Sequence, residues 1–340
     1  MTPPLHLTPL AVFRAASLAL IAGLGAATAL AQEETSPRVE YSIAIHGGAG
    51  VIAPGDEEME RQYREALEEA LEIGRAILED GGTALDAVEQ AVIRMEDDPL
   101  FNAGRGSVFT NAGTNELDAS IMDGRDRDAG AVAGVRTVKN PISLARLVMT
   151  ETRHVLLAAD GADRFAEEME VEQVEPEYFY VERRWQQLQR ARERDEITGA
   201  TEDEDTSTVG AAALDRHGNL AAATSTGGLT NKRFGRVGDS PIPGAGTWAD
   251  NATCAVSGTG RGEIFIRHTV ASRVGALMEY RGLSIQEAMD EVVFEVMPEG
   301  TGGVIGVSAD GEIGWAYNGR GMYRGGADST GRFEIAIWEE

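Results

Sequence analysis

The sequence has a single cysteine, Cys254, among its 340 residues, so no disulfide can form within the chain. Cys254 lies in the apolar run 252–256, which is typical of a buried small hydrophobic side chain rather than of a nucleophile. Only five histidines are present, and neither a His-x₃-His nor a Cys-x₂-Cys spacing occurs. A zinc-dependent mechanism is therefore not expected.

Basic residues are also scarce. The chain has 30 Lys and Arg against 56 Asp and Glu, which gives a net charge of −26. It therefore lacks the positive surface that nucleic acids and anionic membranes require. A glycine-rich phosphate-binding motif with its lysine is missing as well. Hydrophobic residues make up 42% and charged residues 25%, as in soluble globular domains of this length.

One apolar run near the N-terminus resembles a targeting segment. It covers residues 15–27, follows Arg14 and precedes the small-x-small sequence Ala29-Leu30-Ala31. The run is too short to span a bilayer comfortably, and such a site favours cleavage by a signal peptidase. We expect residues 1–31 to be a secretory signal peptide and the protein to be exported, to the periplasm if the source is Gram-negative. An uncleaved membrane anchor is the alternative.

Hydrophobic periodicity predicts helices and strands in separate groups. The expected helices cover residues 57–77, a segment capped by Thr83, 144–169, 181–195, 264–280 and 284–296. The expected strands cover residues 41–46, 116–122, 129–135, 209–214, 220–226, 303–307, 313–317 and 333–338. Groups of strands flanked by groups of helices, with mostly hairpin links, indicate two packed sheets covered by helices on both outer faces.

Thr208 stands at the start of a strand, directly after an acidic segment. We interpret residues 196–207, which include the acidic run 202–205, as a flexible linker. A cut before Thr208 would give this residue a free α-amine beside its own hydroxyl. One residue would then supply both a nucleophile and a general base.

Seven segments carry a resemblance to a known family. They are His46-Gly47-Gly48-Ala49-Gly50, Phe101-Asn102-Ala103-Gly104, residues 116–124, Thr208-Val209-Gly210, the Thr226 segment, residues 235–241 and Gly258-Thr259-Gly260. In this order they resemble the isoaspartyl peptidase/plant-type L-asparaginase family of N-terminal-nucleophile hydrolases. The resemblance covers residues 40–338 and implies a four-layer αββα sandwich. It also implies a precursor that cuts itself into subunits 32–207 and 208–340, and a dimer of such protomers.

The same resemblance assigns catalytic roles to five residues. Thr208 corresponds to the nucleophile and Thr226 to a threonine that hydrogen-bonds it. Thr259 and Gly260 correspond to the oxyanion hole, and Asn102 is a further candidate donor. Three of them also have a purely structural interpretation: a strand-capping residue for Thr208, a strand position for Thr226 and a turn for Asn102. Thr224 lies two residues before Thr226, so it shares the same face of the strand.

A second set of residues resembles a substrate clamp. An aspartyl substrate presents an α-carboxylate, which a guanidinium can hold with two hydrogen bonds, and an α-ammonium, which pairs with a carboxylate. Arg236 and Asp239, with Gly238 between them, match this requirement. A surface ion pair is the structural alternative. Thr259 and Gly260 also belong to the expected substrate contacts.

The family's loop at residues 95–105 implies a structural sodium ion and no catalytic cofactor. Its ligands would be backbone carbonyls of Met95, Glu96, Asp98, Phe101, Ala103 and Arg105. A carbonyl cage leaves almost no trace in the side chains.

The resemblance implies hydrolysis of isoaspartyl dipeptides and L-asparagine through an acyl-enzyme that releases aspartate. Hydrolysis of glycosylated asparagine, N4-(β-N-acetylglucosaminyl)-L-asparagine, is one alternative, and non-catalytic aspartyl binding is another. The residue before the nucleophile departs from the pattern, because relatives often carry glycine where this chain has Ser207. Glycine reaches strained backbone conformations more readily, so we expect slower self-cleavage here.

Overall fold

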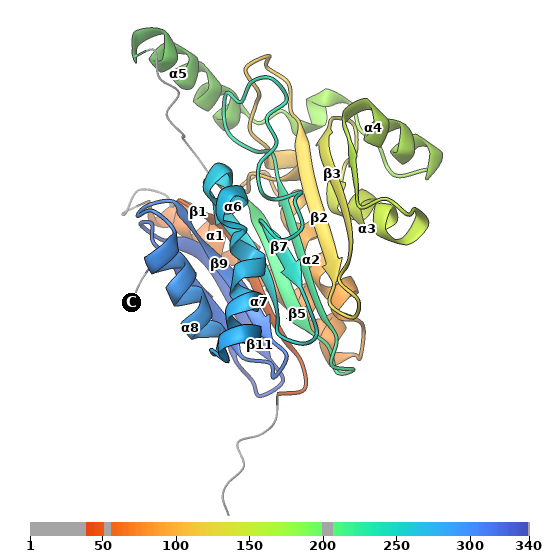
Figure 1. Ribbon diagram of the computed structural model, residues 1–340. Coiled ribbons are helices and arrows are strands. Elements are labelled where there is room, and N and C mark those ends of the chain that lie inside the picture. Colours follow the sequence, from red (N-terminus) through yellow and green to blue (C-terminus); the bar gives the residue numbers. More distant parts are fainter. Residues whose placement is uncertain (1–38, 51–55, 199–206, 339–340) are drawn as a thin grey trace, which may run out of the picture. The chain divides into compact units, whose positions relative to one another are not determined.

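The computed structural model describes residues 39–50, 56–198 and 207–338. Its strands form an eight-stranded sheet in the order β12-β11-β1-β5-β6-β2-β3-β4 and a four-stranded sheet in the order β10-β9-β8-β7 (Figure 1). The bounds are β1 Ser42–Ala49, β2 Leu117–Asp123, β3 Asp128–Val135, β4 Leu156–Ala158, β5 Val209–Leu214, β6 Leu220–Thr226, β7 Thr247–Ala249, β8 Cys254–Gly260, β9 Gly302–Ser308, β10 Ile313–Tyr317, β11 Met322–Asp328 and β12 Phe333–Ala336.

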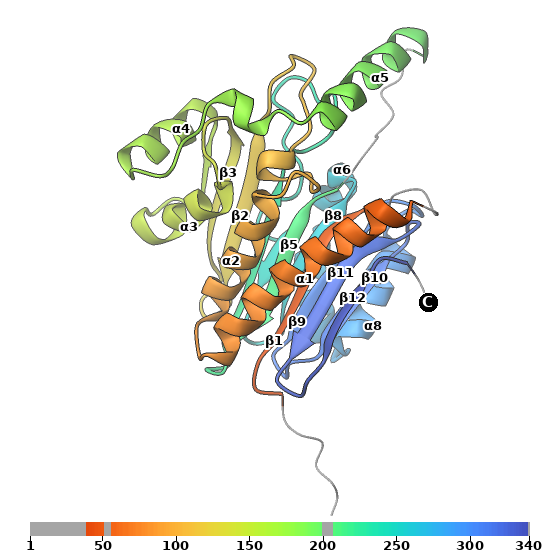
Figure 2. The same cartoon turned by 180° about the vertical axis from the view of Figure 1, so that it is seen from behind.

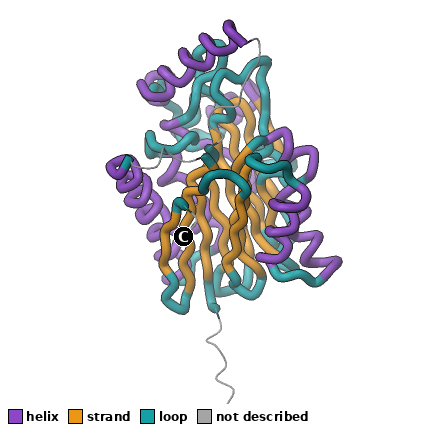
Figure 3. The backbone as a smooth tube through the Cα atoms, turned by 90° about the vertical axis from the view of Figure 1, so that its left-hand side faces the viewer, coloured by secondary structure: helices purple, strands orange, loops and turns teal. Residues whose placement is uncertain are grey.

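Helices cover the outer face of each sheet. The view from behind shows α1 and α2 across the larger sheet (Figure 2), whereas α6, α7 and α8 lie against the smaller one. The bounds are α1 Glu57–Glu79, α2 Ala84–Glu96, η1 Gly104–Gly106, α3 Pro141–Glu151, α4 Ala159–Glu168, η2 Pro176–Phe179, α5 Glu182–Thr198, α6 Gly262–His268, α7 Val270–Arg281, α8 Ile285–Asp290 and the π-helical turn η3 Glu291–Val296. The tube view shows the strands stacked between helical layers (Figure 3), which confirms the predicted αββα sandwich.

Local sequence explains the two helices behind the larger sheet. The side chain of Asp56 accepts a hydrogen bond from the Met59 amide and caps α1, and Thr83 caps α2 in the same way through the Asp86 amide. The apolar face of α1, which includes Leu67 and Leu71, is fully buried against the sheet.

Small side chains allow the two sheets to pack closely. Ala212 of β5 and Ala222 of β6 lie in one buried cluster with Ala255 of β8 and Ile305 of β9. Both faces of these central strands are buried, because helix α2 covers their other side. The catalytic candidates therefore stand on strands that the core holds on both faces.

Two predicted helices differ from the structure. The expected helix 144–169 is α3, strand β4 and α4, because Thr152 ends α3 in an extended conformation. The expected helix 264–280 is split at Thr269, whose φ of 48° breaks the α-helical path between α6 and α7. Strand β11 was not predicted, because its run Met-Tyr-Arg-Gly-Gly-Ala-Asp lacks an apolar alternation.

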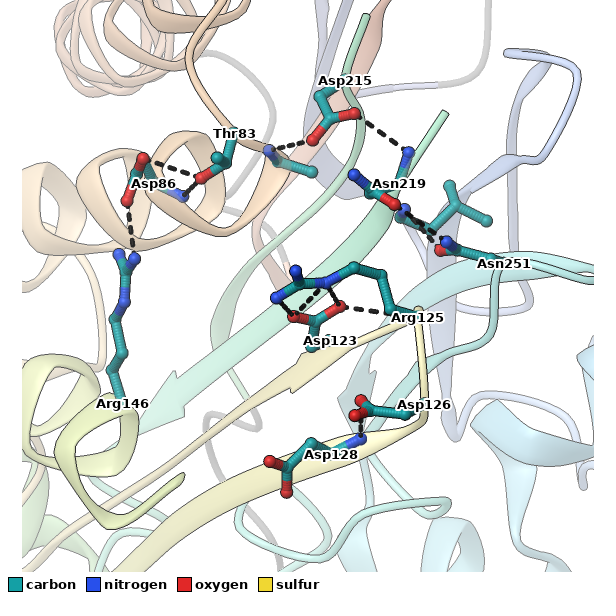
Figure 4. Close-up of polar contacts among 12 residues, drawn as sticks. Thr83, Asp86, Asp123, Arg125, Asp126, Asp128, Arg146, Asp215, Asn219 and Asn251 are labelled. Carbon is teal, nitrogen blue, oxygen red and sulfur yellow. Dashed lines mark hydrogen bonds and ion pairs between the residues drawn. The ribbon is translucent and has the colours of Figure 1, made fainter. Parts of the chain in front are cut away.

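The hairpin turns at one end of the larger sheet form a polar network (Figure 4). The carboxylate of Asp215 accepts hydrogen bonds from the backbone amides of Ala84, His217 and Asn219 at 2.9–3.1 Å. The carboxylate of Asp123 accepts hydrogen bonds from both the backbone amide and the guanidinium of Arg125. This end of the sheet is thus joined to the first turn of α2.

Two predictions fall outside the described residues. The proposed signal peptide 1–31 lies wholly in that part of the chain, and so does most of the linker 196–207; the helix before the linker, α5, continues to Thr198. Across the described ranges, no helix is long and apolar enough to cross a membrane.

Candidate active site

Strand register brings three motif residues to the end of the sheet opposite the turn network. Val209 pairs with Ser225, so Thr208 lies beside Thr226, and Thr226 pairs with Asp118 of β2. The hydroxyl of Thr208 donates to that of Thr226 over 3.1 Å.

The carbonyl oxygen of Ser207 is held by two donors. The side-chain amide of Asn102 donates to it over 2.8 Å, and the hydroxyl of Thr226 lies 3.4 Å from it. Asn102 is itself fixed, because its Oδ1 accepts the Val108 amide and its Nδ2 also donates to the Gly228 carbonyl. Donors that would stabilise an oxyanion at Ser207 are thus already oriented toward its carbonyl oxygen.

The glycine-rich end of β1 packs directly on Ser207. Gly48 has a φ of 119°, and a Cβ there would come within 2.8 Å of the Cα and Cβ of Ser207. Ser207 and Thr208 are only 8% and 5% exposed. The Thr208 hydroxyl is consequently buried.

His46 contacts Thr208 from β1, although no role was predicted for this histidine. Its Nδ1 lies 2.9 Å from the Thr208 carbonyl and its Nε2 lies 2.8 Å from the hydroxyl of Ser257. Burial lowers the pKa of His46 to about 3, against the opposing effect of the bond to Thr208. The ring is therefore neutral at ordinary pH. Because a carbonyl only accepts, Nδ1 carries the proton.

Thr259 and Gly260 lie at the end of β8, close to the glycine-rich end of β1. The Thr259 hydroxyl accepts the amide of Ala49 over 3.1 Å, and Ala49 follows the glycine that packs on Ser207. Gly260 has a φ of 153°, and a Cβ there would come within 2.2 Å of the Thr301 carbonyl. Both predicted oxyanion-hole residues thus lie on the opposite side of Gly48 and Ala49 from the peptide bond between Ser207 and Thr208.

The predicted clamp residues meet around Gly262. A Cβ on Gly262 would lie 2.7 Å from Nη2 of Arg236 and 2.9 Å from Oδ1 of Asp239, so only glycine leaves room for both. Gly238 is similarly close to Arg236. The guanidinium is already bound by Glu263, with Nε to Oε1 and Nη2 to Oε2 both at 3.0 Å. A substrate carboxylate would have to share or replace this carboxylate.

Asp239 is a buried carboxyl with unused capacity. Its Oδ2 has no hydrogen-bond partner among the described residues. Burial raises the pKa of Asp239 to about 7, and Arg236 opposes this shift. An unpaired buried carboxylate is costly, and an incoming ammonium group would supply the missing partner. The site is therefore suited to an α-ammonium.

Two further charged residues lie beneath the clamp. Asp118 is fully buried, its Oδ2 also lacks a partner in the described part of the chain, and burial raises its pKa while Lys232 opposes the shift. The ammonium of buried Lys232 donates to the Glu116 carbonyl over 3.0 Å. Neither residue was identified as part of the site from the sequence, although Asp118 lies inside a recognised motif and Lys232 lies beside one.

A cavity of about 390 Å³ adjoins the clamp. Its lining includes Ala191 and Asp195 of α5, Asn231, Arg233, Arg236 and Glu263. Asp195 accepts hydrogen bonds from Asn231 and Arg233, so the last helix before the cut is joined to the wall of the cavity. This space could receive the part of a substrate that extends beyond its aspartyl group.

The loop predicted to bind sodium has the right chemical character. Met95, Glu96, Phe101 and Ala103 are buried, whereas Asp98 is partly exposed and Arg105 is exposed. The carbonyls of Met95, Asp98 and Ala103 each accept one backbone amide and retain a second lone pair. They could hold a hard cation such as Na⁺. Within the described ranges, no group of three or more His, Cys, Asp or Glu side chains could hold a metal ion.

Cys254 is fully buried in β8, and burial raises the pKa of its thiol to about 12. This agrees with the expectation that it is a small hydrophobic side chain, because a reactive thiol needs a lowered pKa.

Comparisons with known proteins agree with this geometry. A family described as Asparaginase matches residues 39–337. The chain is 51% identical to the isoaspartyl peptidase of Salmonella typhimurium, over 83% of this chain and 93% of that protein. It is 50% identical to the isoaspartyl peptidase of Escherichia coli, over 83% and 91%, and 44% identical to the probable isoaspartyl peptidase/L-asparaginase 2 of Arabidopsis thaliana, over 88% and 99%. The family match and this extent of identity show that the chain belongs to the asparaginase family of isoaspartyl peptidases.

Proposed function

We propose that the protein is a self-processing threonine hydrolase that cleaves isoaspartyl dipeptides and L-asparagine. One observation carries this proposal. The Thr208 hydroxyl donates a hydrogen bond to Thr226, and the neighbouring Ser207 carbonyl accepts one from the side chain of Asn102. The names of the relatives at 50–51% identity support isoaspartyl peptides as substrates, and the name of the relative at 44% identity adds L-asparagine.

Self-cleavage would use these groups directly. The Thr208 oxygen attacks the Ser207 carbonyl carbon, and Asn102 and Thr226 stabilise the oxyanion. The C–N bond then breaks, the Thr208 nitrogen takes up the proton that the Thr208 hydroxyl has lost, and an ester between Ser207 and the Thr208 oxygen remains. Water hydrolyses this ester, which leaves a carboxylate on Ser207 and a free amine on Thr208.

Substrate hydrolysis would repeat this chemistry on a bound aspartyl group. Arg236 would hold the α-carboxylate and Asp239 the α-ammonium, so the β-carbonyl is the group presented for attack. The α-amine of Thr208 would accept the proton from its own hydroxyl and pass it to the leaving amine. An acyl-enzyme forms, and water releases aspartate. No cofactor takes part in these steps.

Three further properties belong to the proposal. The features of residues 1–31 support export, to the periplasm in a Gram-negative source. The carbonyl-rich loop 95–105 supports a structural sodium ion that would brace Asn102. The family resemblance supports a dimer of cut protomers, each made of residues 32–207 and 208–340.

Intact-mass spectrometry and a substrate panel test the proposal together. Wild-type protein should give a fragment that begins at Thr208, and Thr208→Ala should give one uncut, inactive chain. β-Asp-Leu and asparagine should be hydrolysed faster than N4-(β-N-acetylglucosaminyl)-L-asparagine. Fastest turnover of the sugar conjugate would favour glycosylasparaginase activity, and a wild-type chain that stays uncut and inactive would favour a binding protein.

A further inference from the structure

A row of polar side chains crosses the larger sheet one step below the catalytic residues. His46 pairs with Gly210, Gly210 pairs with Thr224, and Thr224 pairs with Ser120. These four positions lie side by side on β1, β5, β6 and β2, and Thr224 is two residues from Thr226. The row therefore lies about 7 Å further along the strands than Thr208 and Thr226.

Two hydroxyls of the smaller sheet face this row. Ser257 of β8 and Thr247 of β7 are direct cross-strand partners. The hydroxyl of Thr224 lies 2.7 Å from that of Ser257 and 2.7 Å from that of Thr247, and Thr247 lies 2.7 Å from Ser120. All these hydroxyl-bearing residues are fully buried. The two sheets are thus joined by one continuous chain of hydrogen bonds.

The protons in this chain have one possible order. Neutral His46 donates from Nδ1 to the Thr208 carbonyl, so its Nε2 must accept from Ser257. The single proton of Ser257 is then used, and Thr224 must donate to it. By the same reasoning Thr247 donates to Thr224. Each link therefore fixes the direction of the next.

The far end of the chain reaches the clamp. In this order Ser120 donates to Thr247, and its oxygen also lies 2.6 Å from the carbonyl oxygen of Ser240, so the single Ser120 proton is shared between two acceptors. Ser240 directly follows Asp239. The Gly246 carbonyl lies 3.2 Å from the Thr224 hydroxyl, whose single proton goes to the closer Ser257, and the Gly246 amide donates to the Asp239 carbonyl. The two ends of the chain are thus the backbone of the nucleophile and the backbone of the clamp.

We propose that Ser257, Thr224, Thr247 and Ser120 are positioning residues that hold the nucleophile and the substrate clamp in one fixed relation. This inference rests on the proposed function, because it concerns how the same site is aligned. Breaking the chain should misplace reacting groups that must lie within a few tenths of an ångström of their productive geometry. None of the four needs to touch the substrate.

Gly210 supports this assignment independently. It lies in regular strand β5, where a Cβ would come within 2.0 Å of the Ser257 hydroxyl oxygen and 2.6 Å of Nε2 of His46. Any larger residue would fill the space in which the bond between His46 and Ser257 forms. The glycine is therefore required by the chain of hydrogen bonds.

Steady-state kinetics of single variants test the inference. Ser257→Ala should lower kcat about tenfold with little change in KM, because it breaks the chain near the nucleophile. Ser120→Ala should raise KM several-fold with little change in kcat, because it breaks the chain near the clamp. Thr224→Val should do both and slow self-cleavage, and Thr224→Ser should restore most of the rate. The double variant Ser257→Ala/Ser120→Ala should lose less than the product of the single losses.

Ser42→Ala is the matched control. Ser42 is equally buried on β1, four residues before His46, and its hydroxyl has no hydrogen-bond partner in the described ranges. This variant should match the wild type. If Thr224→Val keeps wild-type kcat and KM, or if Ser42→Ala loses as much, the inference is overturned while the proposed function stands. A wild-type protein that neither cuts itself nor hydrolyses β-Asp-Leu would overturn both.

Discussion

The two ends of β5, β6 and β2 carry similar residues in opposite electrostatic conditions. At the turn end, the carboxylate of Asp215 accepts three backbone amides and that of Asp123 binds Arg125 (Figure 4). At the catalytic end, Asp118 and Asp239 are buried with one oxygen unpaired each among the described residues, and burial raises both pKa values. The first end stabilises the fold, whereas the second has binding capacity that only a ligand can satisfy.

Substitution of the clamp carboxyl should give the largest effect on activity. We expect Asp239→Asn to lower kcat/KM about 10²–10³-fold, because loss of one partner from a buried charge pair costs about 2–5 kcal/mol. Stability should change the other way. The pKa of Asp239 is raised on folding, so its stabilising contribution is present at low pH and is lost as the pH rises through about 7.

The Asn side chain resembles the protonated carboxyl, so Asp239→Asn should melt no lower than the wild type at pH 8. Calorimetry and kinetics on one preparation check both expectations. A variant that is active but less stable would reverse the proposed contrast between the two ends.

Substitution at the turn end should give the opposite result. Asp215→Ala removes the acceptor for three buried or half-buried amides, including that of Ala84 at the start of α2, and should lower the free energy of unfolding by about 2–4 kcal/mol. The kcat/KM of the folded protein should stay near the wild-type value. Asp126→Ala, in an exposed turn nearby, is the control and should change stability by less than about 0.5 kcal/mol.

The pH dependence of substrate binding should distinguish the ends further. Below about pH 7 the carboxyl of Asp239 takes up a proton and can no longer pair with an ammonium group. We therefore expect kcat/KM to fall about tenfold per pH unit below that value, and the fall should be absent in Asp239→Asn. A profile that is identical in both proteins would assign the titration to another group, such as the α-amine of Thr208.

The smallest effect is expected at Glu263, on the rim of the same end. Its carboxylate is 48% exposed and binds Arg236, so under the proposed function it would compete with the substrate carboxylate. Glu263→Gln should lower KM about two- to fivefold with kcat unchanged, because a half-exposed ion pair contributes little. A higher KM would instead show that Glu263 orients Arg236 for binding.

Much of this molecule could be predicted from its sequence. Abrupt strand starts, capping residues and glycine-rich motifs predicted the sandwich, the position of Thr208 directly before β5 and the proximity of Arg236 to Asp239. Short-range sequence patterns do not predict where one residue breaks a helix, as Thr269 does between α6 and α7. They also do not predict a strand that consists largely of small and polar residues, such as β11.

The roles of His46, Ser257 and Ser120 could not be predicted for a different reason. Each is an ordinary residue of its own strand, and at least one of its partners is more than 100 residues away in the chain. Only strand register brings them together. Glu263 was missed because an ion pair with Arg236 depends on how two loops meet around Gly262.

Gly210 shows how an unremarkable strand glycine can be interpreted. Its backbone is regular, and what it provides is volume that side chains from two neighbouring strands occupy together. In other sandwich proteins, a central-strand glycine flanked in register by a histidine on one side and a hydroxyl residue on the other would be a sequence-level criterion for a hydrogen bond that crosses between layers.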